Sequence, residues 1–164
     1  MKNVKILVVS LAMILAGSLT MRAQEKDPAV IKEIVESKNY VFKAQRVYPQ
    51  NGTTRHLTPE YDLTVRIDSV ISYLPYFGRA YSAPINPSDG GIKFTSDDFN
   101  YTVEKSKKAW DITIKPKDVS DVQQLSLAIY DNGSATLRII STNRQYISFD
   151  GYIEKGKPKE KKAF

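Results

Sequence analysis

The stretch LSLAIYDNGSATLRII, residues 125 to 140, contains the pattern that decides the fold. Apolar side chains stand at every second position on both sides of its centre, at Leu125, Leu127 and Ile129 and again at 135, 137 and 139. A period of two is typical of β-strands with one buried face. Asp131-Asn132-Gly133 lies between the two runs and is the strongest hairpin signal in the chain. The stretch therefore predicts two antiparallel strands joined by a tight turn.

The same alternation recurs along most of the chain, for example at Tyr61, Leu63 and Val65. Strands of a parallel sheet would read as continuous apolar runs, so antiparallel pairing is expected, with further hairpin turns at 96–98 and 142–144. The predicted strands are 40–48, 60–67, 69–74, 91–95, 99–104, 109–115, 124–130, 134–141 and 145–153. A meander of eight or nine one-sided strands curls into a barrel or forms a strongly curved sheet or sandwich, and we expect the barrel.

One short helix is predicted ahead of the strands. Asp27 is a good N-cap, and Pro28 suits the first helical position. Ile31, Ile34 and Val35 follow at helical spacing, and Asn39 can take the left-handed conformation that ends a helix. We expect about ten helical residues whose apolar stripe packs over an open end or a face of the sheet.

The two ends of the chain have the composition of processed or solvated segments. Residues 1–23 place Lys2 and Lys5 before an apolar run and end in a small, polar region, which is the order of a secretory signal peptide cleaved after Ala23. Residues 24–154 are then one β-rich domain, and 155–164 a basic, disordered tail. The chain has no cysteine, which excludes disulfides, thiolate metal sites and lipid attachment. We expect a periplasmic or extracellular protein that is not a lipoprotein and keeps no membrane-spanning segment after cleavage.

The basic charge lies at the ends of the chain. Of the formal charge of +6, three positive charges belong to the signal segment and four net positive charges to the tail, so the folded part is close to neutral. A binding groove for nucleic acid would need positive charge within the domain itself. Nucleic acid is therefore not expected as a partner.

An aromatic segment, residues 73–91, interrupts the regular succession of predicted strands and hairpin turns. Its three prolines exclude it from a central strand, and loops of this length usually have a function or are disordered. Its many rings argue against disorder. The candidate ligand-binding residues are Tyr73, Tyr76, Phe77, Arg79 and Tyr81.

Two interpretations of the aromatic segment stay open. In the first, the rings form a plug over one end of the sheet, and Gly78 supplies a backbone angle that other residues resist. In the second, the rings line the mouth of a shallow pocket in which Arg79 pairs with a carboxylate or phosphate. A plug can also serve as a lid, so the two are compatible.

The sequence contains few signs of catalysis. His56 is the only histidine, so a usual zinc site cannot form, and a triad of His56 with Asp62 or Asp68 has no accompanying nucleophile elbow. Asp97, Asp98, Asp118 and Asp121 do not have the spacing of a calcium loop. We expect no enzyme, no metal site and no cofactor.

Two functions fit these observations. The first is a non-catalytic module that binds a small molecule, a lipid or a peptide at the aromatic mouth. The second is a structural or interaction module that docks onto another envelope protein through the tail or through an exposed sheet edge. The last predicted strand, 145–153, is the candidate edge.

Nearly the whole mature chain resembles a known family. The segments YDLTVRIDSVISYLPYFGRAYSAP, DGGIKFTSDDFNYTVEKSKKAWDITIKP and LAIYDNGSATLRIISTNRQYISFDGYI are similar to exported proteins of Bacteroidetes-type bacteria, classified as domain of unknown function 4251. The resemblance implies a cell-envelope protein, and the family has no established activity, ligand or catalytic residues to carry over to this chain. Family members often have a lipid-accepting cysteine, which this chain lacks.

Overall fold

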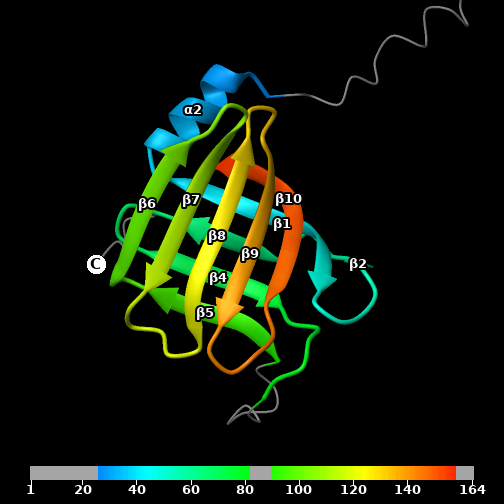
Figure 1. Cartoon of the computed structure of the whole chain (residues 1–164). Coiled ribbons are helices and arrows are strands. Elements are labelled where there is room, and N and C mark those ends of the chain that lie inside the picture. Colours follow the sequence, from blue (N-terminus) through cyan, green and yellow to red (C-terminus); the bar gives the residue numbers. More distant parts are fainter. Residues whose placement is uncertain (1–25, 82–89, 158–164) are drawn as a thin grey trace, which may run out of the picture.

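Nine antiparallel strands form one nearly closed, barrel-shaped sheet, and a helix lies across one end of it (Figure 1). The computed structural model describes residues 26–81 and 90–157. The helix is α2 (Pro28–Glu36), and the strands are β1 (Tyr40–Pro49), β3 (Asp62–Val65), β4 (Val70–Pro75), β5 (Gly91–Ser96), β6 (Phe99–Lys105), β7 (Ala109–Pro116), β8 (Val122–Tyr130), β9 (Ser134–Ser141) and β10 (Ile147–Lys155). The short strand β2 (Arg55–His56), which was not predicted, pairs with β1. The mainly β, barrel-shaped fold is confirmed, and every predicted strand end lies within two residues of the observed one.

The strand order is β5-β4-β3-β1-β10-β9-β8-β7-β6. The first and last long strands pair along their whole length, from Tyr40 opposite Lys155 to Pro49 opposite Ile147. The prediction that 145–153 forms a sheet edge is therefore wrong, because β10 lies between β1 and β9. The two edges are β5 and β6. In Figure 1, β6 to β9 run steeply in front of β1, β4 and β5, which cross behind them.

The interior of the barrel is filled by side chains. The inward positions of the strands form one cluster of buried hydrophobic residues, whose largest members are Tyr40, Phe42 and Phe149. The hydroxyl of Tyr40 lies 3.2 Å from that of Tyr101 on β6, and burial raises the pKa of Tyr40 well above its usual value. A buried hydroxyl needs such a partner, so Tyr101 joins an edge strand to the core.

Helix α2 begins and packs as its sequence predicts. The Asp27 side chain accepts a hydrogen bond of 2.8 Å from the amide of Ala29, and Ile31, Ile34 and Val35 enter the core. The predicted stop is one residue late, because Lys38 rather than Asn39 takes the left-handed conformation, with φ of 48°. Asn39 directly precedes β1, and its carbonyl accepts from the amide of Gly156 at 2.9 Å.

The predicted turns have different outcomes. Residues 131–133 join β8 to β9 as expected, with Gly133 at φ 86°. Residues 96–98 do not form a hairpin, because β5 and β6 on either side of them do not pair with each other. They form a corner between the two edge strands instead.

The carboxylate of Asp118, in the β7–β8 connection, holds this corner. It accepts from the Ser96 hydroxyl at 2.5 Å and from the Asp97 amide at 3.0 Å. These hydrogen bonds to the charged form, with the Ser96 bond the largest contribution, lower the pKa of Asp118 from 3.8 to about 2. An ion pair of 3.0 Å between Lys117 and Asp98 adds a second tie.

Candidate functional site

Tyr73, the first of the predicted site residues, lies on the outer wall of the barrel, because Ser72 and Leu74 on either side of it are buried. Its ring stacks on Tyr61 with 5.7 Å between centroids, and the Lys93 ammonium lies 4.8 Å from its centroid. Lys93 approaches from β5, and Tyr61 from the β3 side. The ring of Tyr73 is therefore part of a surface cluster with its own partners.

Tyr76 and Phe77 pack against the core. They belong to the segment that follows β4, which lies at the end of the barrel away from α2 (Figure 1). The Tyr76 hydroxyl lies 2.8 Å from the carbonyl oxygen of Arg79 and 3.1 Å from that of Gln145, and it can donate to either. Burial raises the pKa of Tyr76. The guanidinium of Arg55 lies 4.8 Å from the Phe77 ring centroid. These two rings occupy the position that a plug would take.

Arg79 and Tyr81 are held by their backbones while their side chains are exposed. The amide of Gln145 donates to the Arg79 carbonyl at 3.2 Å, and the Tyr81 amide donates to the Asn143 carbonyl at 2.7 Å. The Tyr81 side chain is 71% exposed. Residues 82–89 of the aromatic segment lie outside the described residues. The binding site predicted at Tyr73, Tyr76, Phe77, Arg79 and Tyr81 stays a prediction.

The role expected for Gly78 is corrected by the structure. Its φ is not positive, since the described glycines with positive φ are Gly52 and Gly133. A side chain is excluded for a different reason, because a Cβ on Gly78 would meet the Tyr76 hydroxyl and lie 2.7 Å from its Cζ. Gly78 makes room for the folded-back ring.

Arg144 joins three loops at this end, and sequence reasoning missed it. Its Nη2 lies 3.0 Å from Asp121 Oδ2, its Nη1 donates to the Gly91 carbonyl at 3.0 Å, and its guanidinium lies 5.2 Å from the Tyr76 ring centroid. Its side chain is only 15% exposed. No local pattern could have identified it, because all three partners are more than twenty residues away in the chain.

The other candidates for chemistry are used elsewhere or stand apart. His56 is exposed on β2, and Asp62 forms an ion pair of 2.6 Å with Lys43. Asp118 holds the β5–β6 corner, and Asp121 binds Arg144. Within residues 26–81 and 90–157, no group of three or more His, Asp or Glu side chains is placed to hold a metal ion.

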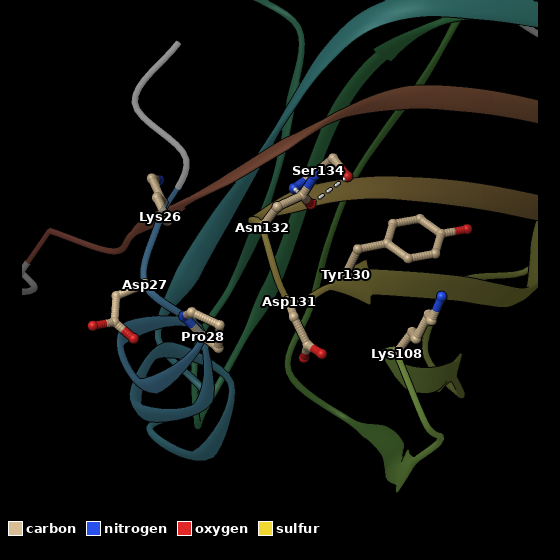
Figure 2. Close-up of a pocket in the computed structure, with 8 residues that line it drawn as sticks. All are labelled: Lys26, Asp27, Pro28, Lys108, Tyr130, Asp131, Asn132 and Ser134. Carbon is tan, nitrogen blue, oxygen red and sulfur yellow. Dashed lines mark hydrogen bonds between the residues drawn. The ribbon is translucent and has the colours of Figure 1, made fainter. Parts of the chain in front are cut away.

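A groove of about 910 Å³ opens between the start of α2 and the β8–β9 hairpin. Figure 2 shows the Tyr130 ring and the Lys108 ammonium on one side of it and the start of α2 on the other. The Tyr130 side chain is 40% exposed. The lining residues are Lys26, Asp27, Pro28, Lys108, Tyr130, Asp131, Asn132 and Ser134.

Three of the four charged side chains of this groove already have partners. Lys26 Nζ donates to the Ile153 carbonyl at 2.5 Å. Asp27 caps the helix, and Asp131 pairs with Lys105 at 2.6 Å. Lys108 has no partner among the described residues. Its ammonium is therefore the free charge of the groove.

Asn132 adds a second free donor group. Its Oδ1 accepts from the amide and the hydroxyl of Ser134, at 3.0 and 2.7 Å (Figure 2). This fixes the orientation of the side-chain amide, and no described residue accepts from its Nδ2. The groove can therefore offer an apolar ring, a cation and an amide donor to one ligand.

Three smaller grooves are less suited to bind a ligand, because their charged side chains are already paired or their lining is largely polar. The groove of about 420 Å³ between β1 and β2 contains Lys43 and Arg46, which pair with Asp62 and Asp150. The groove of about 270 Å³ beside β5 contains Arg144, which already binds Asp121. The third, of about 630 Å³, lies over β6, β7 and the start of β8 and is lined largely by polar side chains.

The comparisons with known proteins agree on one family. A family model described as domain of unknown function, DUF4251, matches residues 22–153. A crystal structure of a DUF4251 family protein from Bacteroides eggerthii superimposes with a TM-score of 0.60 at 16% identity, covering 81% of this chain and 90% of that one. At this identity the similarity supports the fold alone.

A comparison with curated proteins found no significant match. No helix within the described residues has the length and hydrophobicity needed to cross a membrane. The family model covers most of the chain, and the related crystal structure has the same fold. This chain therefore belongs to the DUF4251 family.

Proposed function

We propose that this protein is a non-catalytic ligand-binding module of the bacterial cell envelope, exported by its N-terminal signal peptide. The groove between α2 and the β8–β9 hairpin is the ligand site in this proposal. Its volume of about 910 Å³ is the observation that carries the proposal, because small-molecule sites commonly have volumes of about 300–1,000 Å³.

The packing of the barrel supports a site on the surface rather than inside. Barrels that hold a ligand in their interior keep a cavity there, whereas buried hydrophobic side chains occupy the interior of this one. Tyr40, Phe42 and Phe149 are fully buried in this core. A ligand would have to displace these side chains, so an outer groove is the better candidate.

The free groups of the groove indicate the chemical class of the ligand. The exposed face of Tyr130 favours an apolar or flat portion, and the Lys108 ammonium favours a carboxylate or phosphate. The Asn132 amide nitrogen adds a neutral donor. The best fit is therefore a small amphipathic anion.

Titration with two matched amphiphiles tests this assignment. Dodecanoate has the expected combination of a carboxylate and an apolar chain, and dodecyltrimethylammonium has the same chain with the opposite charge. Backbone amide resonances of Lys26, Asp27 and residues 130–134 should shift and saturate with dodecanoate below its micelle concentration. Tyr130→Ala and Lys108→Ala should each weaken binding about tenfold, the effect of losing roughly 1.4 kcal/mol.

Two variants serve as matched controls. Tyr146→Ala removes a ring of similar exposure outside the groove, and Lys32→Ala removes an exposed lysine on α2. Both should bind dodecanoate as the unaltered protein does. Equal binding of both amphiphiles would contradict the role of Lys108. Saturable shifts at residues 73–81 in place of 130–134 would move the site to the aromatic segment.

A second function has support at the edges of the sheet. Strands β5 and β6 each pair with a single neighbour, β4 and β7 respectively, which leaves two open edges. An unpaired edge is a site for adding another strand. The interaction module with an envelope partner therefore stays the alternative, with β5 or β6 as its docking edge.

A further inference from the structure

The two open edges differ in how accessible they are. β5 begins at Gly91, whose carbonyl is already bound by Arg144. β6 has no proline and no buried residue, and Val103 on its core side is still 41% exposed. In Figure 1, β6 forms the outer margin of the front of the barrel. β6 is therefore the freer edge.

The β6–β7 turn shows which backbone groups of β6 are free. The Ser106 amide donates to the Ala109 carbonyl at 2.9 Å, so these two residues form a hydrogen-bonded pair beside the turn. Hydrogen-bonded and non-hydrogen-bonded pairs alternate along an antiparallel ladder, so the even-numbered residues of β6 bond to β7. The N–H and C=O groups of Phe99, Tyr101, Val103 and Lys105 then point to the open edge.

We propose that two copies of this chain associate through β6, antiparallel and edge to edge, with the two-fold axis at Thr102. This register places Tyr101 opposite Val103 of the second copy and Phe99 opposite its Lys105. Both are pairs of residues with outward N–H and C=O groups, so each pair can exchange two hydrogen bonds. Thr102 lies opposite itself as a non-hydrogen-bonded pair.

The side chains of β6 are complementary to themselves in this register. Tyr101 opposite Val103 is an aromatic and β-branched pair, which stabilises antiparallel sheets, and it covers the exposed Val103. Asn100 opposite Glu104 can form a hydrogen bond, while Lys105 opposite Phe99 keeps its ion pair with Asp131. No two like charges lie opposite each other.

The charges beyond the ends of β6 match as well. In the same register, the corner residue Asp97 of one copy comes near the turn residue Lys107 of the other. Both side chains are exposed, and neither has an interaction partner among the described residues. The two-fold axis creates this contact twice. Charge complementarity at both ends therefore favours a second copy of this chain over an unrelated strand.

Single cysteines test the register directly, because the chain has no cysteine of its own. In a non-hydrogen-bonded pair the Cα atoms are about 4.5 Å apart, which is within disulfide range, so Thr102→Cys should form a covalent dimer under mild oxidation. Asn100→Cys is the control. Its two copies would be offset by four residues, or about 13 Å, and should not cross-link.

Sedimentation equilibrium of the mature chain at up to about 0.5 mM tests the association itself. Val103→Pro removes an outward N–H without removing a β6–β7 hydrogen bond and should give a monomer. Lys107→Glu and Asp97→Lys should each raise the dimer dissociation constant about tenfold, since two attractive contacts become repulsive. The double variant, with both charges exchanged, should recover the original value, and circular dichroism checks the fold of each variant.

Three results would overturn the proposal. The first is a monomeric mass across the whole concentration range. The second is cross-linking of Asn100→Cys as fast as that of Thr102→Cys. The third is a chain ending at Lys157 that dimerises when the full mature chain does not, because the tail would then be the occupant of the β6 edge.

Discussion

The two ends of the barrel use their aromatic and charged residues differently. At the end away from α2, the Tyr76 hydroxyl is bound to backbone carbonyls and Arg144 joins three loops. At the α2 end, Tyr130 and Lys108 border a large groove, and the Lys108 ammonium has no described partner. Closely spaced aromatic residues can therefore have their polar groups bound within the protein. A few side chains around a groove, in contrast, can leave groups available for a ligand.

This contrast separates stability from binding by position. Substitutions of Tyr76 and Arg144, whose polar groups are bound within the protein, should lower the free energy of unfolding, while substitutions of Tyr130 and Lys108 in the groove should change stability little. Urea denaturation measures this difference.

Arg144→Ala should have the largest effect. It leaves the partly buried Asp121 carboxylate and the Gly91 carbonyl without their donor, so unfolding should become easier by about 2–4 kcal/mol. Arg138→Ala is the control, since this exposed arginine lies 4.2 Å from the Tyr146 ring centroid and should lose at most about 1 kcal/mol. Equal losses would mean that Arg144 does not hold the loops together.

Gly78→Ala should be next in size. The new Cβ collides with Tyr76, and relieving the collision displaces the ring, at a cost of about 1–3 kcal/mol. Gly90→Ala is the matched control, because no heavy atom lies within 4 Å of its added Cβ. Its stability should stay the same or rise slightly. A neutral Gly78→Ala would show that the Tyr76 ring is loosely held.

Tyr76→Phe and Tyr130→Phe compare the same change at the two ends. Loss of the Tyr76 hydroxyl removes a donor that lies within reach of the Arg79 and Gln145 carbonyls, and it should cost about 1 kcal/mol. Loss of the Tyr130 hydroxyl at the exposed groove should change stability by less than about 0.5 kcal/mol. A larger loss of stability for Tyr130→Phe than for Tyr76→Phe would refute the view that the Tyr76 hydroxyl is bound and the Tyr130 hydroxyl is not.

The Asp118 carboxylate should make a small contribution that depends on pH. Its pKa is lowered in the folded protein from 3.8 to about 2, so its stabilising effect is complete above the unfolded value of about 3.8. The effect is lost as the pH falls through about 2. Asp118→Asn should lose this part of the pH dependence in urea midpoints measured between pH 5 and 2. An unchanged slope would show that the Ser96 and Asp97 bonds do not favour the ionised form.

Most strands were predictable because one of their faces is buried and the other is not. Alternation at Leu125, Leu127 and Ile129 is a local property, and so are the Asp27 cap and the turn at Gly133. The corner at 96–98 was wrongly predicted as a hairpin turn, because Ser and Asp residues occur both in hairpin turns and in corners between strands that do not pair. The choice depends on Asp118, which lies in a different connection.

The groove could not be predicted, although several of its residues lie in recognised signals. Asp27 and Pro28 start the helix, and Asn132 belongs to the hairpin turn. Their proximity depends on α2 packing over the barrel end. The many aromatic rings at 73–81 predicted a ligand site at the opposite end, where Tyr76 and Phe77 pack against the core.

The amino-acid sequence by itself determined the period of two, the turn at residues 131–133 and the helix start, because each depends on residues close together in the chain. The pairing of β1 with β10 and the resulting edges at β5 and β6 were decided only when the sheet curved round one core. Many pairings bury the same apolar faces, and the side-chain contacts that distinguish them join residues far apart in the chain. The partners of Arg144 and Asp118 and the contact of Tyr76 with Gln145 are of this kind, so tertiary structure decided which polar groups are bound and which are free.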